Sequence, residues 1–190
     1  MSRESAREKI LETAGELFYE HGFRAIGVDT IVEQSGVAKM TLYRHFPSKD
    51  DLIAAYLQDS HDSSVAWIES LIVPYAEEGR AAIIAIFEGV AQQASQDVCY
   101  GCTFVVAASE FAEHTHPAHQ IALSYKYKML EILQRLTEQA GAANPTQLAQ
   151  QLFLLMDGAW AAVRVFGPSN PSQSLVSAVR VLLGASLPHA

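Results

Sequence analysis

Residues 28–46, VDTIVEQSGVAKMTLYRHF, decide the fold that the sequence predicts. Val28, Ile31 and Val32 follow one another at helical spacing, and Gly36 then permits a sharp turn. The apolar stripe resumes in a second short helix at Val37, Leu42 and Phe46. Two short helices therefore share one buried seam, as in a helix-turn-helix.

The other side of the second helix carries no acid, although the whole chain has a net charge of −8 and a pI near 5.3. Residues 1–50 hold seven of the 13 Lys and Arg and eight of the 21 Asp and Glu, so the acidic excess lies in the rest of the chain. The segment from Lys39 through Arg44 to Lys49 contains no acid at all. A local positive strip on an otherwise acidic protein is the first indication of contact with nucleic acid.

Composition limits the remaining possibilities. Hydrophobic residues make up 49% of 190 residues, which is enough for a large helical core. The longest apolar runs fall far short of the ~18 residues of a membrane span, and no signal-peptide core follows Met1. With only two cysteines a disulfide framework is excluded. We therefore expect a cytoplasmic protein that has no membrane partner and needs no cofactor.

Helical periodicity continues through the chain, and no stretch alternates as a strand would. The pattern predicts an all-α fold of about nine helices, the first near residues 2–21 and the next two within residues 28–46. The others are expected at about residues 49–72, 78–94, 103–113, 118–139, 145–166 and 173–186. Ser48 has capping-box spacing with Asp51 and should begin the fourth helix. We expect a DNA-binding domain at residues 1–48 and a helical ligand-binding and dimerisation domain at residues 49–190.

The last two helices are apolar most of the way round, so they need cover on two sides. One side is the chain's own core, and the other is a candidate for a second copy, although burial within one subunit is the alternative. The expected dimerisation residues are Leu152, Phe153, Ala159, Trp160, Val163, Leu175, Val179 and Leu182. Asp157 is an acid inside this apolar run, and it could be paired, solvent-facing or a ligand anchor.

The run DTIVEQSGVAKMTLYRHFPSKDDL, which ends at Leu52, resembles the TetR (tetracycline-repressor-like) family of transcriptional regulators. The resemblance implies that Lys39, Met40, Thr41 and Arg44 face base edges in the major groove. It also implies that Tyr43, His45, Lys49 and the helix start around Val28 contact phosphates. Two departures are clear, because the family usually has a hydroxyl residue where this chain has Ala38 and often one near Gly27. Loss of such a cap typically costs ~1 kcal/mol.

The resemblance further implies a non-enzymatic, ligand-responsive regulator that binds a pseudo-palindromic operator as a homodimer. We expect a repressor that is released from double-stranded DNA by a small apolar or aromatic effector. The candidate effector-binding residues are Phe87, Tyr100, Phe104, Glu110, Phe111, His114, Tyr125, Met156 and Trp160. Aromatic residues at helical spacing are also typical of a plain core, so packing is the competing interpretation.

Cys99 and Cys102 suggest an alternative sensor. A Cys-x-x-Cys pair followed by His114, His116 and His119 is compatible with metal binding or with a redox switch. The spacing matches no standard zinc finger. Metal or redox sensing therefore stays the alternative to a small organic effector.

Overall fold

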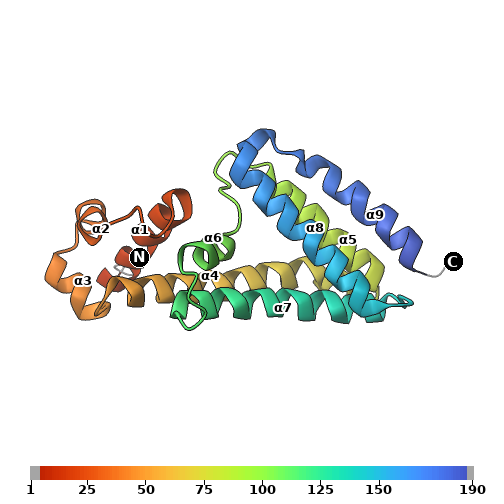
Figure 1. Ribbon diagram of the computed structural model, residues 1–190, viewed down its shortest axis with the longest axis horizontal. Coiled ribbons are helices and arrows are strands. Elements are labelled where there is room, and N and C mark those ends of the chain that lie inside the picture. The colour runs from red at the N-terminus through yellow and green to blue at the C-terminus, as the bar shows by residue number, and fades with distance from the viewer. Residues whose placement is uncertain (1–4, 188–190) are drawn as a thin grey trace. The chain divides into compact units, whose positions relative to one another are not determined.

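The computed structural model describes residues 5–187, and within them every regular element is helical (Figure 1). Short 3₁₀ helices at Val73–Tyr75, Gly167–Ser169 and Pro171–Ser174 join nine α-helices. The α-helices are α1 (Ala6–His21), α2 (Val28–Ser35), α3 (Lys39–His45), α4 (Lys49–Ile72), α5 (Gly79–Ala94), α6 (Thr103–Glu110), α7 (Pro117–Gln139), α8 (Pro145–Phe166) and α9 (Leu175–Ser186). The predicted all-α class with about nine helices is confirmed for this part of the chain.

Capping residues set the start of α1. The Ser5 hydroxyl accepts the Glu8 N–H at 3.2 Å, and the Glu8 carboxylate accepts the Ser5 N–H at 2.8 Å. This reciprocal capping box begins the helix at Ala6, later than the start expected near Ser2, which lies outside the described residues. The predicted cap at Ser48 is also present, because its hydroxyl accepts the Asp51 N–H at 3.1 Å, while the Asp51 carboxylate accepts from the Ser48 hydroxyl at 2.6 Å.

Two other expected bounds are wrong. The helix expected at residues 103–113 ends at Glu110, beyond which the chain turns so that a ring nitrogen of His119 lies 2.8 Å from the Phe111 carbonyl oxygen. The last α-helix begins at Leu175 because a 3₁₀ turn precedes it. Buried Asn170 fixes that turn by accepting the Ser172 N–H at 2.9 Å and donating to the Ala94 carbonyl at 2.8 Å.

The chain forms two compact units, each assembled from two separate stretches. Within the described residues, the first contains residues 5–62 and 103–125, and the second contains residues 63–102 and 126–187. Helices α4 and α7 contribute one part to each unit. Helix α6 therefore belongs to the same compact unit as the helix-turn-helix. The expected functional boundary between residues 48 and 49 stays a prediction.

In the first unit, α1 packs against both helices of the helix-turn-helix, α2 and α3. The non-helical residues 22–27 join α1 to α2 and are called the α1–α2 loop below. Phe23 of this loop is fully buried, and its ring centroid lies 5.3 Å from that of Phe18 and 5.9 Å from that of Phe111. The other fully buried side chains of this core include Ile10, Ile31, Leu42, Leu52 and Leu57.

In the second unit, α5, α8 and α9 pack side by side (Figure 1). Gly79 lets the start of α5 approach the end of α7, since a Cβ there would lie 2.6 Å from the Leu136 carbonyl oxygen. The core includes Ile83, Phe87, Met156 and Leu183. Among residues 5–187, no helix has both the length and the apolar character needed to cross a membrane.

The two terminal helices bury one side within their own chain. Five of the expected dimerisation residues are covered by this intrachain core, namely Leu152, Ala159, Val163, Leu175 and Val179. Phe153, Trp160 and Leu182 are half-buried. The apolar side chains that these helices leave exposed are different ones, Leu154, Val165, Phe166 and Val181. The core of a single chain thus explains why the five covered residues are apolar. Their contribution to dimerisation stays a prediction.

Candidate nucleic-acid interface

Helix α3 is anchored by one side and presents the other to solvent. Leu42 is fully buried, and Phe46 closes the helix from its C-terminal end. Met40 on the opposite side is 81% exposed, and Tyr43 is also exposed. Of the other residues expected at DNA, Lys39 and Arg44 are exposed, whereas Val28, Thr41 and His45 are half-buried. Their contacts with DNA stay predictions, but the geometry leaves them available.

The turn before α3 is built without the usual hydroxyl cap. Neither Gly27 nor Ala38 makes a side-chain cap, as the sequence indicated. Ser35 supports the turn instead, because its hydroxyl lies 3.4 Å from both the Val32 carbonyl and the Val37 N–H. Gly36 adopts a left-handed φ of 64°, which favours glycine. Sequence reasoning missed Ser35, although a serine directly before a turn glycine is a recognisable signal.

Lys39 is already engaged in the free protein. Its Nζ lies 2.6 Å from Asp29 Oδ1, so an ion pair joins α3 to α2. The hydrogen bond and the charge of Asp29 raise the pKa of Lys39 above its usual value. Any hydrogen bond from Lys39 to a base edge must therefore compete with Asp29.

Lys49 also has an internal partner. Its Nζ donates to the Phe23 carbonyl oxygen at 2.6 Å and so ties the start of α4 to the α1–α2 loop. Partial burial lowers the pKa of Lys49, against the opposing effect of nearby Asp50. The expected phosphate contact stays a prediction, and the observed role is to hold the loop.

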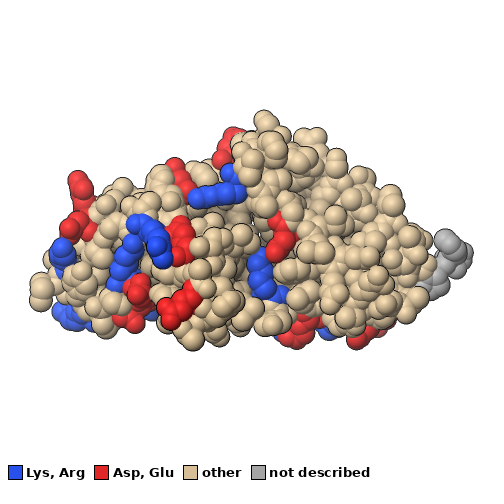
Figure 2. Space-filling model, in the orientation of Figure 1, with Lys and Arg blue, Asp and Glu red and all other residues tan. Residues whose placement is uncertain are grey.

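The charged surface agrees with this local arrangement. Over the helix-turn-helix, Lys and Arg alternate with Asp and Glu, whereas the visible surface of α8 and α9 is mostly uncharged (Figure 2). Electrostatic attraction to DNA must therefore come from the Lys and Arg side chains of the helix-turn-helix and not from the net charge of the protein.

The comparisons with known proteins agree with the geometry. The family model described as bacterial regulatory proteins, tetR family, matches residues 10–56, which include the whole helix-turn-helix. The crystal structure of a Streptomyces avermitilis protein described as a TetR transcriptional regulator has 33% sequence identity and a TM-score of 0.84. It covers 96% of this chain and 98% of its own. The chain belongs to the TetR family.

Two curated relatives differ in the direction of regulation. The transcriptional activator FasR of Mycolicibacterium smegmatis is 34% identical over 91 residues, which are 46% of this chain and 42% of FasR. The transcriptional repressor KstR2 of Mycobacterium tuberculosis is 30% identical over 99 residues, 50% of either chain. This chain thus spans half or less of each relative. It is a DNA-binding transcriptional regulator of the TetR family.

Most residues expected at an effector are packed in cores or against neighbours. Phe87, Phe104, Met156 and Tyr125 are buried, and the Phe104 and Tyr125 rings stack at 3.9 Å within the first unit. His114 is exposed, and Tyr100 is half-buried. Glu110 and Phe111 contact the α1–α2 loop, and Trp160 packs on a small apolar cluster. Effector binding by these nine residues stays a prediction.

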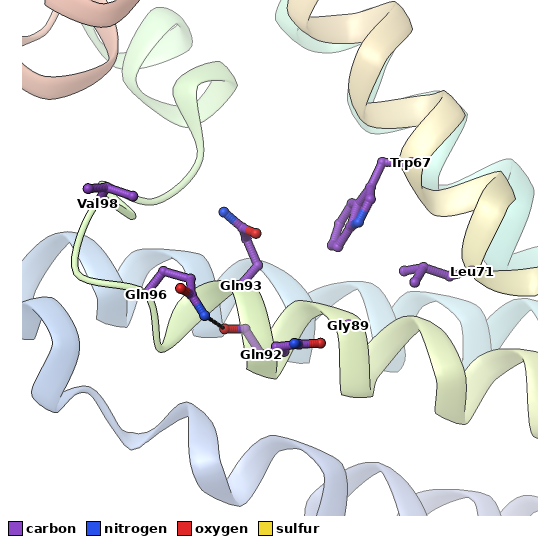
Figure 3. Close-up of a pocket in the computed structure, with 7 residues that line it drawn as sticks. All are labelled: Trp67, Leu71, Gly89, Gln92, Gln93, Gln96 and Val98. Carbon is purple, nitrogen blue, oxygen red and sulfur yellow. Dashed lines mark hydrogen bonds between the residues drawn. The ribbon is translucent and has the colours of Figure 1, made fainter.

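A cavity of about 510 Å³ lies in the second unit, between α4 and α5 (Figure 3). Trp67 projects from α4 toward the Gln93 carboxamide on α5, and Leu71 lies beside it (Figure 3). The remaining lining residues are Gly89, Gln92, Gln96 and Val98. None of these seven side chains within residues 5–187 is charged. Sequence reasoning missed it because glutamines on a helix are ordinarily read as solvated surface.

The cysteine region does not form a metal centre in the described residues. Among residues 5–187, no three His, Cys, Asp or Glu side chains lie together as a metal site requires. Cys99 is buried beside Ala94 and Val163, and it forms no disulfide with Cys102. Cys102 Sγ lies 3.7 Å from Lys126 Nζ. The metal alternative thus lacks a ligand set in this part of the chain, while redox sensing stays a prediction.

Proposed function

We propose that the protein is a homodimeric repressor that reads a pseudo-palindromic operator through α3 and leaves it when a small molecule binds. One observation carries the DNA-reading part, namely that α3 is anchored by buried Leu42 while Lys39, Met40, Tyr43 and Arg44 face solvent. Arg and Lys can donate to guanine, and Tyr can reach phosphate.

Exposed apolar side chains support the homodimer. Leu154, Val165 and Phe166 of α8 and Val181 of α9 are exposed. The face of these two helices that Figure 2 shows carries few charges. Such a surface is typical of an interface between identical subunits. A two-fold dimer would present two copies of α3 to half-sites about 34–36 Å apart.

The cavity between α4 and α5 supports a neutral, flat effector. Its volume falls within the ~300–1,000 Å³ range of small-molecule sites. The Trp67 indole offers a surface for an aromatic ring, and the carboxamides of Gln92, Gln93 and Gln96 can each donate and accept hydrogen bonds. Since the described residues that line the cavity include no charged side chain, an uncharged aromatic amide or lactam fits it better than a carboxylate or an amine. The effector expected from the sequence was apolar or aromatic. The glutamine side chains favour an aromatic effector that also carries polar groups.

Repression is the simpler direction of regulation, because operator occupancy alone suffices to block transcription. A reporter gene placed behind the selected operator tests it. Deletion of the regulator should raise expression from that promoter, whereas a fall would identify an activator.

Selection of bound DNA from a random pool, followed by mobility shift, tests the DNA-reading function. We expect a pseudo-palindrome bound by two chains. Arg44→Ala should weaken operator binding by ~1–3 kcal/mol and relax the preference at one position of each half-site. Recovery of no enriched sequence, or binding by monomers alone, would exclude the proposal.

A further inference from the structure

Glu110, the last residue of α6, binds the backbone of the α1–α2 loop. Its Oε2 accepts the Arg24 N–H at 2.7 Å, and its Oε1 accepts the Phe23 N–H at 3.3 Å. Both donors precede Glu110 by more than 80 residues, and all three residues belong to the first unit. One carboxylate thus satisfies two consecutive N–H groups of the loop, directly after Gly22, whose own N–H still bonds to the Phe18 carbonyl of α1.

The loop is shaped around this carboxylate. Gly22 has a φ of +85°, and a Cβ at this position would collide with Glu110 Oε1. Phe111, next to Glu110, packs its ring 5.9 Å from that of Phe23. The Arg24 guanidinium lies 5.7 Å from the Phe111 ring centroid. The end of α6 therefore holds the loop through hydrogen bonds, ring packing and a cation–π contact.

The loop in turn sets where the helix-turn-helix begins. It leads directly into α2 at Val28, and α2 begins without a side-chain cap that could fix its start locally. On its other side the loop is held by Lys49, through the Phe23 carbonyl. Phe23 is thus bound at its N–H by α6 and at its C=O by α4.

We propose that Glu110 is a positioning residue for DNA binding, because α6 holds the α1–α2 loop, and with it α2 and α3, through this carboxylate. The inference rests on the proposed DNA-reading function and adds a determinant that lies outside the helix-turn-helix. Glu110 was expected at an effector, and that role stays a separate prediction.

Two variants and a matched control test the proposal. Glu110→Ala removes both acceptors, and Glu110→Gln keeps the size but places an amide donor opposite one N–H. Glu113→Gln is the control, because Glu113 is exposed and its carboxylate accepts the hydroxyl of nearby Thr115 at 2.9 Å. Hydrogen exchange of the Phe23 and Arg24 amides reports the contact directly. It should accelerate about tenfold or more in both Glu110 variants and stay unchanged in Glu113→Gln.

Operator affinity, measured at a temperature where circular dichroism shows both variants folded, reports the positioning. We expect a loss of about tenfold or more for the selected operator, and a smaller loss for random-sequence DNA, which depends on phosphate contacts more than on alignment of α3. If Glu110 only stabilised the fold, the loss of affinity would not differ between the selected operator and random-sequence DNA. If Glu110→Ala fails to fold, the nearly isosteric Glu110→Gln decides the outcome.

Unchanged amide exchange would show that the carboxylate does not hold the loop. Accelerated exchange with unaltered operator affinity would show that the loop does not position α3. Either result overturns the proposal. If the unaltered protein selects no DNA, the proposed function itself fails, and the amide exchange still reports the Glu110 contact separately.

Discussion

Lys39 Nζ lies 2.6 Å from Asp29 Oδ1, so a cation expected at base edges is paired with an acid of the preceding helix. Both side chains are largely exposed, and exposed ion pairs contribute little to stability. The pair therefore contributes little to folding. If Lys39 binds DNA as proposed, the DNA acceptor must replace the Asp29 carboxylate.

Replacing Asp29 by Asn should strengthen DNA binding. The change frees Lys39 and removes a negative charge beside α3, which should raise the operator affinity roughly two- to fivefold. Fluorescence anisotropy with labelled operator at several salt concentrations measures it. Glu33→Gln removes one charge from the same helix and serves as the control. Equal gains in both variants would show that overall charge, and not release of Lys39, is responsible.

Replacing Asp157 by Asn should destabilise the protein. Lys126 Nζ lies 2.5 Å from Asp157 Oδ1, and the two side chains are only 18% and 28% exposed. The change removes the Asp157 charge beside the half-buried Lys126 ammonium, which should cost about 1–3 kcal/mol. Urea unfolding at fixed protein concentration measures the loss. Glu88→Gln breaks the exposed pair with Arg180 and should cost less than about 0.5 kcal/mol. Similar losses in the two variants would contradict this account.

Asp157 also shows where sequence reasoning stops. Its position inside an apolar run indicated that the acid needed an explanation, but its partner lies on another helix, 31 residues away. The predicted end of α6 was wrong for a similar reason. Nothing near Glu110 in the sequence indicates that its side chain contacts residues 23 and 24. A contact between residues far apart in the chain leaves no pattern in the sequence around either residue.

The helix-turn-helix could be predicted because its determinants are local. Gly36 supplies the turn, Leu42 and Phe46 supply the buried seam, and Ser48 begins the next helix. The cavity beside Trp67 could not be predicted, because it depends on how closely α4 and α5 approach, and Gly89 is the only local sign of that approach.

Replacing Gly89 by Ala should impair effector binding without unfolding the protein. A Cβ at this position would lie 2.6 Å from Leu71 Cδ1 and 3.4 Å from Trp67 Cζ2, so the Leu71 side chain must move and the cavity narrows. We expect a loss of ~1 kcal/mol or more, about fivefold to tenfold in affinity. Quenching of tryptophan fluorescence by a compound that releases operator measures it. Gly184→Ala, where nothing lies within 4 Å, is the control and should bind normally. Unchanged affinity in Gly89→Ala would place the effector elsewhere.

Replacing Val181 by Glu should separate the proposed dimer. Val181 is 75% exposed on α9, and in a two-fold interface each new carboxylate would lose water close to its symmetry mate. Like charges placed together in this way cost several kcal/mol, so the dimer dissociation constant should rise about a hundredfold or more. Val73→Glu is the control, since Val73 is 71% exposed but lies outside α8 and α9. Sedimentation should then find the Val181 variant as a monomer and the Val73 variant as a dimer. The Val181 variant should also lose operator binding, because one chain covers only one half-site. Dimers that persist in both variants would show that the exposed side of α9 does not form the interface.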